Sequence, residues 1–201
     1  MAKIITIAHQ KGGVGKSTIA LNLALCFQDQ LKVALVDSDL QGSIYHVKEE
    51  FPGLDIFLAE KITDIPKLEH ELIIVDTPPY LSNKLSDLFM ISDYVLIPTK
   101  AGFFDVMAIR ATLALVKFAQ AKKADLKAGI VLNMVKHRSG ITKDVYDLLG
   151  AMGIPVLNTR IHDRVSITRS AITTGVLNGA DLKAKEELTS LAEEIVNYIS
   201  A

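Results

Sequence analysis

The chain has 201 residues, of which 49% are apolar and 22% are charged, and its formal net charge is −1. This length and composition exclude a disordered polypeptide and favour a single domain with a full α/β core over residues 1–201. A net charge near zero gives no overall attraction to a polyanion, so nucleic-acid binding would need a local basic patch.

The single cysteine, Cys26, excludes an internal disulfide and a cysteine-ligated cluster, which indicates a reducing compartment. No apolar run reaches the roughly 18–20 residues that span a bilayer. The first residues enter a strand pattern at once, so we expect no signal peptide. Together these observations predict a cytoplasmic protein.

Five short apolar runs, rich in isoleucine and valine, recur along the chain. They do not alternate with polar residues, which is typical of strands buried on both faces of a parallel sheet. We predict strands at Ile4–Ala8, Val33–Val36, Leu72–Val75, Tyr94–Ile97 and Ile130–Val135.

Helical patterns lie between several of these strands. We predict helices at about residues 17–28, 105–121, 141–152 and 182–199. Alternating strands and helices predict a doubly wound α/β fold, with a mostly parallel sheet and helices on both faces. Residues 41–68 give no clear pattern, and no linker or second domain is evident.

A glycine-rich segment, KGGVGKST at residues 11–18, joins the first predicted strand to the first predicted helix. This order is the setting of a phosphate-binding loop (P-loop). Glycines let the backbone fold around an anion, and the helix places its positive end at the phosphates. Lys16 would contact the β- and γ-phosphates, Ser17 would ligate Mg²⁺, and Thr18 would bond the α-phosphate. The residues predicted to bind ATP here are Gly12, Gly13, Val14, Gly15, Lys16, Ser17 and Thr18.

The loop departs from the usual pattern G-x-x-x-x-G-K-[ST], because Gln10 replaces the first glycine and Lys11 adds a second lysine. This combination resembles the deviant P-loop of the ParA/MinD family, K-G-G-x-G-K-[ST]. Further segments resemble that family's motifs in the same order: VDSDLQG at 36–42, IIVDTPP at 73–79 and VLNMV at 131–135. The residues of the first two motifs resemble those of the short ParA-type partition ATPases more than those of MinD.

The resemblance implies roles for three aspartates that follow predicted strands. Asp76 would hold Mg²⁺ through water, Asp37 would contribute to the same hydration shell, and Asp39 would orient or activate the attacking water. For each of them, a turn or helix-capping aspartate is the alternative.

The resemblance also implies roles for Lys11 and Asn133. Lys11 would reach across a homodimer interface to the partner's phosphates and act in catalysis together with Lys16 and Asp39. Asn133 would pair with the adenine base through its amide. The alternatives are a solvated loop lysine and a strand-end asparagine. Asp105 is interpreted as a cap of the helix that it opens.

ParA-like proteins bind nonspecific DNA as ATP dimers, whereas MinD-like proteins bind membranes through a basic C-terminal helix. Here the C-terminal segment carries glutamates and no lysine or arginine after Lys185, so we expect no direct membrane binding. No helix-turn-helix region precedes the P-loop, so we expect no specific operator binding. The candidate DNA contacts are Arg164, Arg169, Lys183 and Lys185. A mixed-charge surface is the alternative.

These features predict a nucleoid-associated ParA-type ATPase that moves cargo, with hydrolysis that is slow until a ParB-like or other partner activates it. The alternative is a MinD-like or other superfamily ATPase with a positioning, assembly or metabolic role and no DNA binding.

Overall fold

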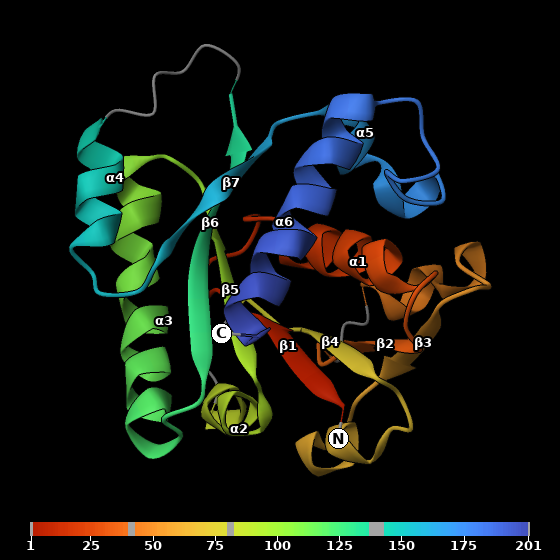
Figure 1. Cartoon of the computed structure of the whole chain (residues 1–201), viewed down its shortest axis with the longest axis horizontal. Helices are drawn as coiled ribbons and strands as arrows, with labels where there is room; N and C mark the ends of the chain where they lie inside the picture. The colour runs from red at the N-terminus through yellow and green to blue at the C-terminus, as the bar shows by residue number, and fades with distance from the viewer. Residues whose placement is uncertain (1, 40–42, 80–82, 137–142, 201) are drawn as a thin grey trace.

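The computed structural model describes residues 2–39, 43–79, 83–136 and 143–200. A seven-stranded sheet crosses the molecule in the order β3-β2-β4-β1-β5-β6-β7, and all of its described strand pairs are parallel (Figure 1). The strands are β1 (Lys3–Ile7), β2 (Val33–Asp37), β3 (Asp55–Leu58), β4 (Leu72–Asp76), β5 (Tyr94–Thr99), β6 (Lys127–Val135) and β7 (Val156–His162). The α/β prediction is confirmed.

Helices cover both faces of the sheet. The α-helices are α1 (Lys16–Phe27), α2 (Asn83–Ile91), α3 (Phe103–Lys122), α4 (Lys143–Gly150), α5 (Val165–Thr168) and α6 (Leu182–Ser200). Three 3-10 helices add η1 (Tyr45–Glu50), η2 (Ile62–Lys67) and η3 (Ser170–Ile172). No helix in the described ranges combines the length and apolar character needed to cross a membrane.

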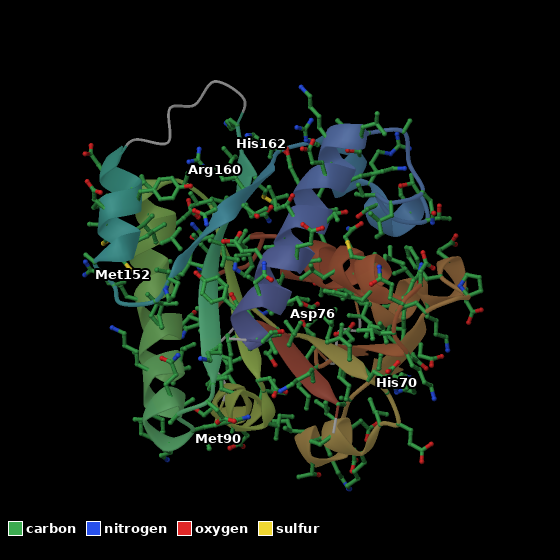
Figure 2. All side chains as sticks on the ribbon, viewed as in Figure 1. His70, Asp76, Met90, Met152, Arg160 and His162 are labelled. Carbon is green, nitrogen blue, oxygen red and sulfur yellow. The ribbon has the colours of Figure 1, made fainter. Side chains whose placement is uncertain are left out.

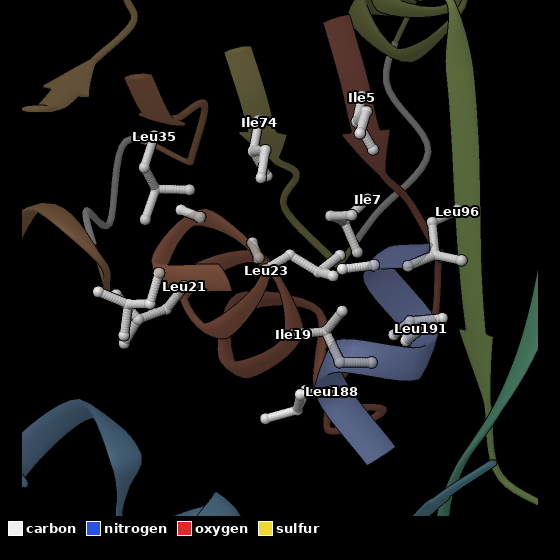
Figure 3. Packing of buried hydrophobic residues seen from close by; sticks show 14 of the residues in the cluster. Ile5, Ile7, Ile19, Leu21, Leu23, Leu35, Ile74, Leu96, Leu188 and Leu191 are labelled. Carbon is white, nitrogen blue, oxygen red and sulfur yellow. The ribbon is translucent and has the colours of Figure 1, made fainter. Parts of the chain in front are cut away.

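Alternate residues of the central strands enter separate cores, because side chains of a strand point to opposite faces in turn. Ile5 and Ile7 pack against α1 and α6 on one face (Figure 3). The neighbouring Ile4 enters a cluster on the other face, beside Leu88 of α2. A third cluster joins α3 and α4 to β5 and β6. Burial on both faces explains why these strands read as continuous apolar runs.

The five predicted strands and four predicted helices are all present, with ends that differ by a few residues. Residues 141 and 142 of one predicted helix lie outside the described residues. The elements that the sequence did not predict are β3, β7, α2, α5 and the 3-10 helices. Both missed strands form edges of the sheet, and only Leu157 and Ile161 of β7 are fully buried, so neither presents an apolar run.

The strand order reverses around β1, which lies between β4 and β5. Ligands of open parallel sheets bind at such a switch point, beyond the carboxyl ends of the strands. The register places Asp76 of β4 beside Ile7 of β1 and beside Asp37 of β2. Two carboxylates and the segment that follows β1 therefore meet at one edge of the sheet.

Candidate functional site

The loop after β1 leads directly into α1. Gly13 and Gly15 have φ angles of 70° and 87°, in the left-handed region that glycine adopts without strain. Gly15 is the N-cap residue of α1, so the unpaired N–H groups of the first helical turn face the loop. A Cβ atom at Gly15 would lie 2.4 Å from Nδ2 of Asn133, so this position has no room for a side chain. The glycine turn therefore lies at a helix N-terminus, which is a setting that favours anions.

Lys16 and Ser17 occupy the first turn of α1 and face the acidic edge of the sheet. The Lys16 side chain is buried, and this burial lowers its pKa, while Asp76 and Asp39 act in the opposite direction. The Ser17 hydroxyl donates a hydrogen bond to Oδ2 of Asp76 at 2.5 Å. The first turn of α1 and the end of β4 are therefore in direct contact, and the metal-binding roles of Ser17 and Asp76 remain predictions.

Asp76 lies near the middle of the molecule (Figure 2), and its side chain is 2% exposed. Its Oδ1 atom is buried and has no hydrogen-bond partner among the described residues. Burial raises the pKa of Asp76 to about 7, and the hydrogen bond from Ser17 opposes this rise. A buried carboxylate oxygen with a free acceptor, next to a serine hydroxyl, fits a hydrated Mg²⁺ ion.

Asp37 is fully buried and holds the loop that follows β2. Its Oδ1 accepts a hydrogen bond from the N–H of Asp39 at 3.0 Å, and its Oδ2 accepts from those of Ile44 and Tyr45 at 2.9 and 3.2 Å. The metal role of Asp37 and the water-orienting role of Asp39 remain predictions. The end of this motif, residues 40–42, lies outside the described residues.

Asn133 lies at the carboxyl end of β6 and is 3% exposed. Its Nδ2 donates to the carbonyl oxygen of Val14 at 2.7 Å, so it fastens the P-loop to β6. Asn133 also lines a cavity of about 60 Å³ with Thr18. The other lining residues are Met134, His162, Asp163, Arg164, Ile167 and Thr168. The base-binding role of Asn133 remains a prediction. Its contact with Val14 could not be predicted, because the two residues are 119 positions apart in the chain.

Lys11 extends away from the loop and forms an ion pair with Asp105 in the first turn of α3, with 2.6 Å between Nζ and Oδ1. Asp105 therefore binds Lys11, while Gly102 is the N-cap residue of α3. The backbone N–H of Lys11 donates to Nδ1 of His9 at 2.8 Å. Burial and the nearby Lys16 lower the pKa of His9 to about 4, which keeps the imidazole neutral and able to accept. The sequence reading missed His9 as part of this site.

Two phenylalanines at the start of α3 are exposed beside this ion pair. Phe103 is 63% exposed and Phe104 is 80% exposed. Their rings pack edge to face, with 5.8 Å between the centroids. Exposed aromatic rings next to a functional site mark a candidate interaction surface.

The four candidate DNA-binding residues differ in their surroundings. Arg169 and Lys183 are exposed, and Lys185 is half-buried. Arg164 is instead only 13% exposed, and its Nη2 donates to Oε1 of Glu187 at 2.8 Å. This hydrogen bond and the negative charge of Glu187 raise the pKa of the Arg164 guanidinium. A DNA contact by any of the four remains a prediction, and Arg164 already has carboxylate partners within the chain.

Comparison with known proteins gives the context of this site. Residues 5–174 match the model of the CobQ/CobB/MinD/ParA nucleotide binding domain. The Maintenance of carboxysome distribution protein A of Halothiobacillus neapolitanus is 28% identical, over 96% of this chain and 95% of that protein.

Two solved structures share the fold. A putative plasmid partition protein from Borrelia burgdorferi bound to AMPPNP is 24% identical with a TM-score of 0.71, and the match covers 98% of each chain. The septum site-determining protein MinD of Pyrococcus horikoshii, complexed with Mg-ADP, is 20% identical with a TM-score of 0.73, covering 97% of this chain and 96% of that one. The family match and the loop geometry agree, and the chain belongs to the CobQ/CobB/MinD/ParA family of P-loop ATPases.

Proposed function

We propose that this protein is a ParA-type partition or positioning ATPase. It binds ATP with Mg²⁺, forms a homodimer in that state and binds DNA without sequence preference. Hydrolysis is slow until a ParB-like or other partner activates it, and the cycle moves a cargo over the nucleoid in the cytoplasm. The protein makes no direct contact with the membrane.

The observation that carries the proposal is the contact between the P-loop helix and the acidic strand ends. Lys16 supplies a positive charge, Ser17 supplies a hydroxyl ligand, and Asp76 supplies a buried carboxylate with a free oxygen. Phosphoryl transfer needs these groups to neutralise the phosphates and to hold Mg²⁺ between them. The proposed activity is therefore hydrolysis of the γ-phosphate of ATP.

Dimerisation is supported by the surface around Lys11. The ion pair to Asp105 places this lysine at the first turn of α3, the turn that also carries Phe103 and Phe104. A surface of exposed aromatic rings around a charged group has the composition of an interface centre. We therefore place the dimer interface on this side of the molecule.

Replacing Phe103 and Phe104 together by serine is expected to weaken ATP-dependent dimerisation by about tenfold or more, because apolar burial by two rings is lost. Binding of ATP to the monomer should stay within about twofold. Light scattering with and without ATP measures the first effect, and calorimetry measures the second. Phe118→Ser is the matched control, since Phe118 is 54% exposed but lies further along the same helix. Equal loss in both variants would contradict this interface.

DNA binding is expected to need ATP and to pair two copies of a local basic patch. Lys183→Ala should weaken binding about uniformly across sequences and lower the salt slope by about 1 per lost contact, or about 2 per dimer. Lys185→Ala should act in the same direction. Fluorescence anisotropy with duplex DNA at several salt concentrations, with ATP, ADP or no nucleotide, measures this effect.

The control for DNA binding is Lys127→Ala, an exposed lysine at the amino end of β6, at the edge of the sheet opposite the P-loop. It should leave DNA affinity unchanged. Absence of DNA binding by the wild type in every nucleotide state would contradict the partition function. A MinD-like or other family ATPase with a positioning, assembly or metabolic role would then be the better interpretation.

A further inference from the structure

A second charged cluster lies apart from the phosphate loop and is centred on Glu187 of α6. Its Oε1 accepts hydrogen bonds from Nδ1 of His162 and from Nη2 of Arg164, each at 2.8 Å. Its Oε2 accepts from the backbone N–H of His162 at 2.9 Å. Burial raises the pKa of Glu187, but the hydrogen bonds from Arg164 and His162 outweigh this effect and leave the pKa below its ordinary value. One ionised carboxylate thus holds the residues after β7 and the end of β7, where Figure 2 labels His162.

Two residues of this cluster form part of the wall of the cavity beside the P-loop. His162 and Arg164 line it together with Thr18 and Asn133. Thr18 lines this cavity and is the residue expected to bond the α-phosphate, so the nucleoside of a bound nucleotide would extend toward the cavity. Its volume of about 60 Å³ is far below the roughly 300 Å³ at which ligand pockets begin. Entry of a base therefore requires the wall to move.

The wall is fastened to α6 at a second point. Oδ1 of Asp181 accepts from the N–H of Ala184 at 3.1 Å, and so caps this helix. Oδ2 of Asp181 accepts from the Ser166 hydroxyl at 2.7 Å, and the Asp181 carboxylate lies 3.9 Å from Nη1 of Arg164. Arg164 thus lies near the carboxylate of Asp181, directly before α6, and bonds that of Glu187 in the second turn. Lys183 and Lys185 lie between these two carboxylates in the sequence.

We propose that Glu187 is a positioning residue that couples the nucleoside side of the site to the first turn of α6. This inference rests on the proposed binding of ATP. With Glu187 in place, Arg164 and His162 shape the cavity wall, and movement of that wall by a base shifts the first turn of α6. The phosphates alone, held at the P-loop, do not move it. The pair Arg164–Glu187 thereby connects the base to the basic end of the helix.

The test compares ATP with inorganic tripolyphosphate, both with Mg²⁺, by calorimetry. Glu187→Gln keeps the size of the side chain but cannot accept all of the hydrogen bonds, so ATP affinity should fall by about tenfold. Tripolyphosphate affinity should stay within about twofold. Arg164→Ala should have the same pattern. Glu186→Gln, on the exposed side of the same turn, is the matched control and should change neither affinity.

Hydrogen exchange of the amides of residues 182–187 provides the second readout. In the wild type, ATP should change their protection and tripolyphosphate should not, and Glu187→Gln should remove the ATP effect. The proposal is overturned if Glu187→Gln binds both ligands as the wild type does, or loses both equally. It is also overturned if ATP and tripolyphosphate act alike on these amides in the wild type. Failure of the wild type to bind either ligand would instead overturn the proposed function.

Discussion

Replacing Lys16 by alanine is expected to reduce the affinity for ATP with Mg²⁺ by at least about a hundredfold. The side chain is 6% exposed, and it is the cation of the P-loop that faces Asp76 and Asp39. Its removal takes away a charged partner of the phosphates and leaves the acidic strand ends without a neutralising group. A hydrogen bond between charged groups, lost in a buried site, accounts for an effect of this size.

Calorimetric titration of ATP into the variant measures the loss. Circular dichroism should show an unchanged fold, because the glycine turn and α1 do not depend on this side chain. Lys32→Ala is the control, since Lys32 is an exposed lysine at the amino edge of the sheet, and it should bind ATP as the wild type does. An affinity for ATP within about threefold of the wild type in Lys16→Ala would refute the phosphate-loop assignment.

The second large effect is expected for Lys11→Ala, which should keep most of its ATP affinity and lose dimerisation and hydrolysis. Lys11 is 43% exposed, and its Nζ binds Asp105 of its own chain. To reach a partner's phosphates, it has to leave this ion pair. Loss of a positive charge supplied in trans should lower the hydrolysis rate by about 10³-fold.

Light scattering with ATP and a phosphate-release assay measure these two losses. Asp105→Asn is the informative companion, because it releases Lys11 without removing its charge, and it should keep the ability to dimerise. A Lys11→Ala variant that dimerises and hydrolyses ATP normally would identify Lys11 as a solvated loop lysine. If the Asp105→Asn variant loses dimerisation and hydrolysis as Lys11→Ala does, the ion pair itself supports the interface.

The phosphate site could be predicted from the sequence because most of its residues lie in one continuous segment of the chain. The strand β1, the glycine turn and α1 follow in order, and Ser17 lies directly beside Lys16. Asp76 ends a buried apolar run, so the position of its carboxylate follows from the rule for parallel sheets. These patterns are local, and the sequence carries them without knowledge of the tertiary contacts.

The contacts that the sequence did not predict join residues far apart in the chain. Asp105 looked like a helix cap, but its partner Lys11 is 94 positions away. Arg164 looked like a free surface cation, but its partner Glu187 lies 23 positions further on, in a helix whose glutamates all read as one polar face. The strand β7 supplies this geometry, and as a half-exposed edge strand it has no apolar run to reveal it. Ion pairs of this kind leave no periodic signal.

The close approach of Asn133 to Gly15 limits which residues homologous sequences can carry at these two positions. Since a methyl group at position 15 would overlap the amide of Asn133, neither residue can enlarge without a change in the other. The Asn133 amide donates a hydrogen bond to the carbonyl oxygen of Val14. A smaller residue at position 133 would remove this hydrogen bond and loosen the glycine turn of the P-loop. Because the φ angle of Gly15 also disfavours any side chain, we expect position 15 to remain glycine among homologous sequences and position 133 to keep a side chain no larger than asparagine.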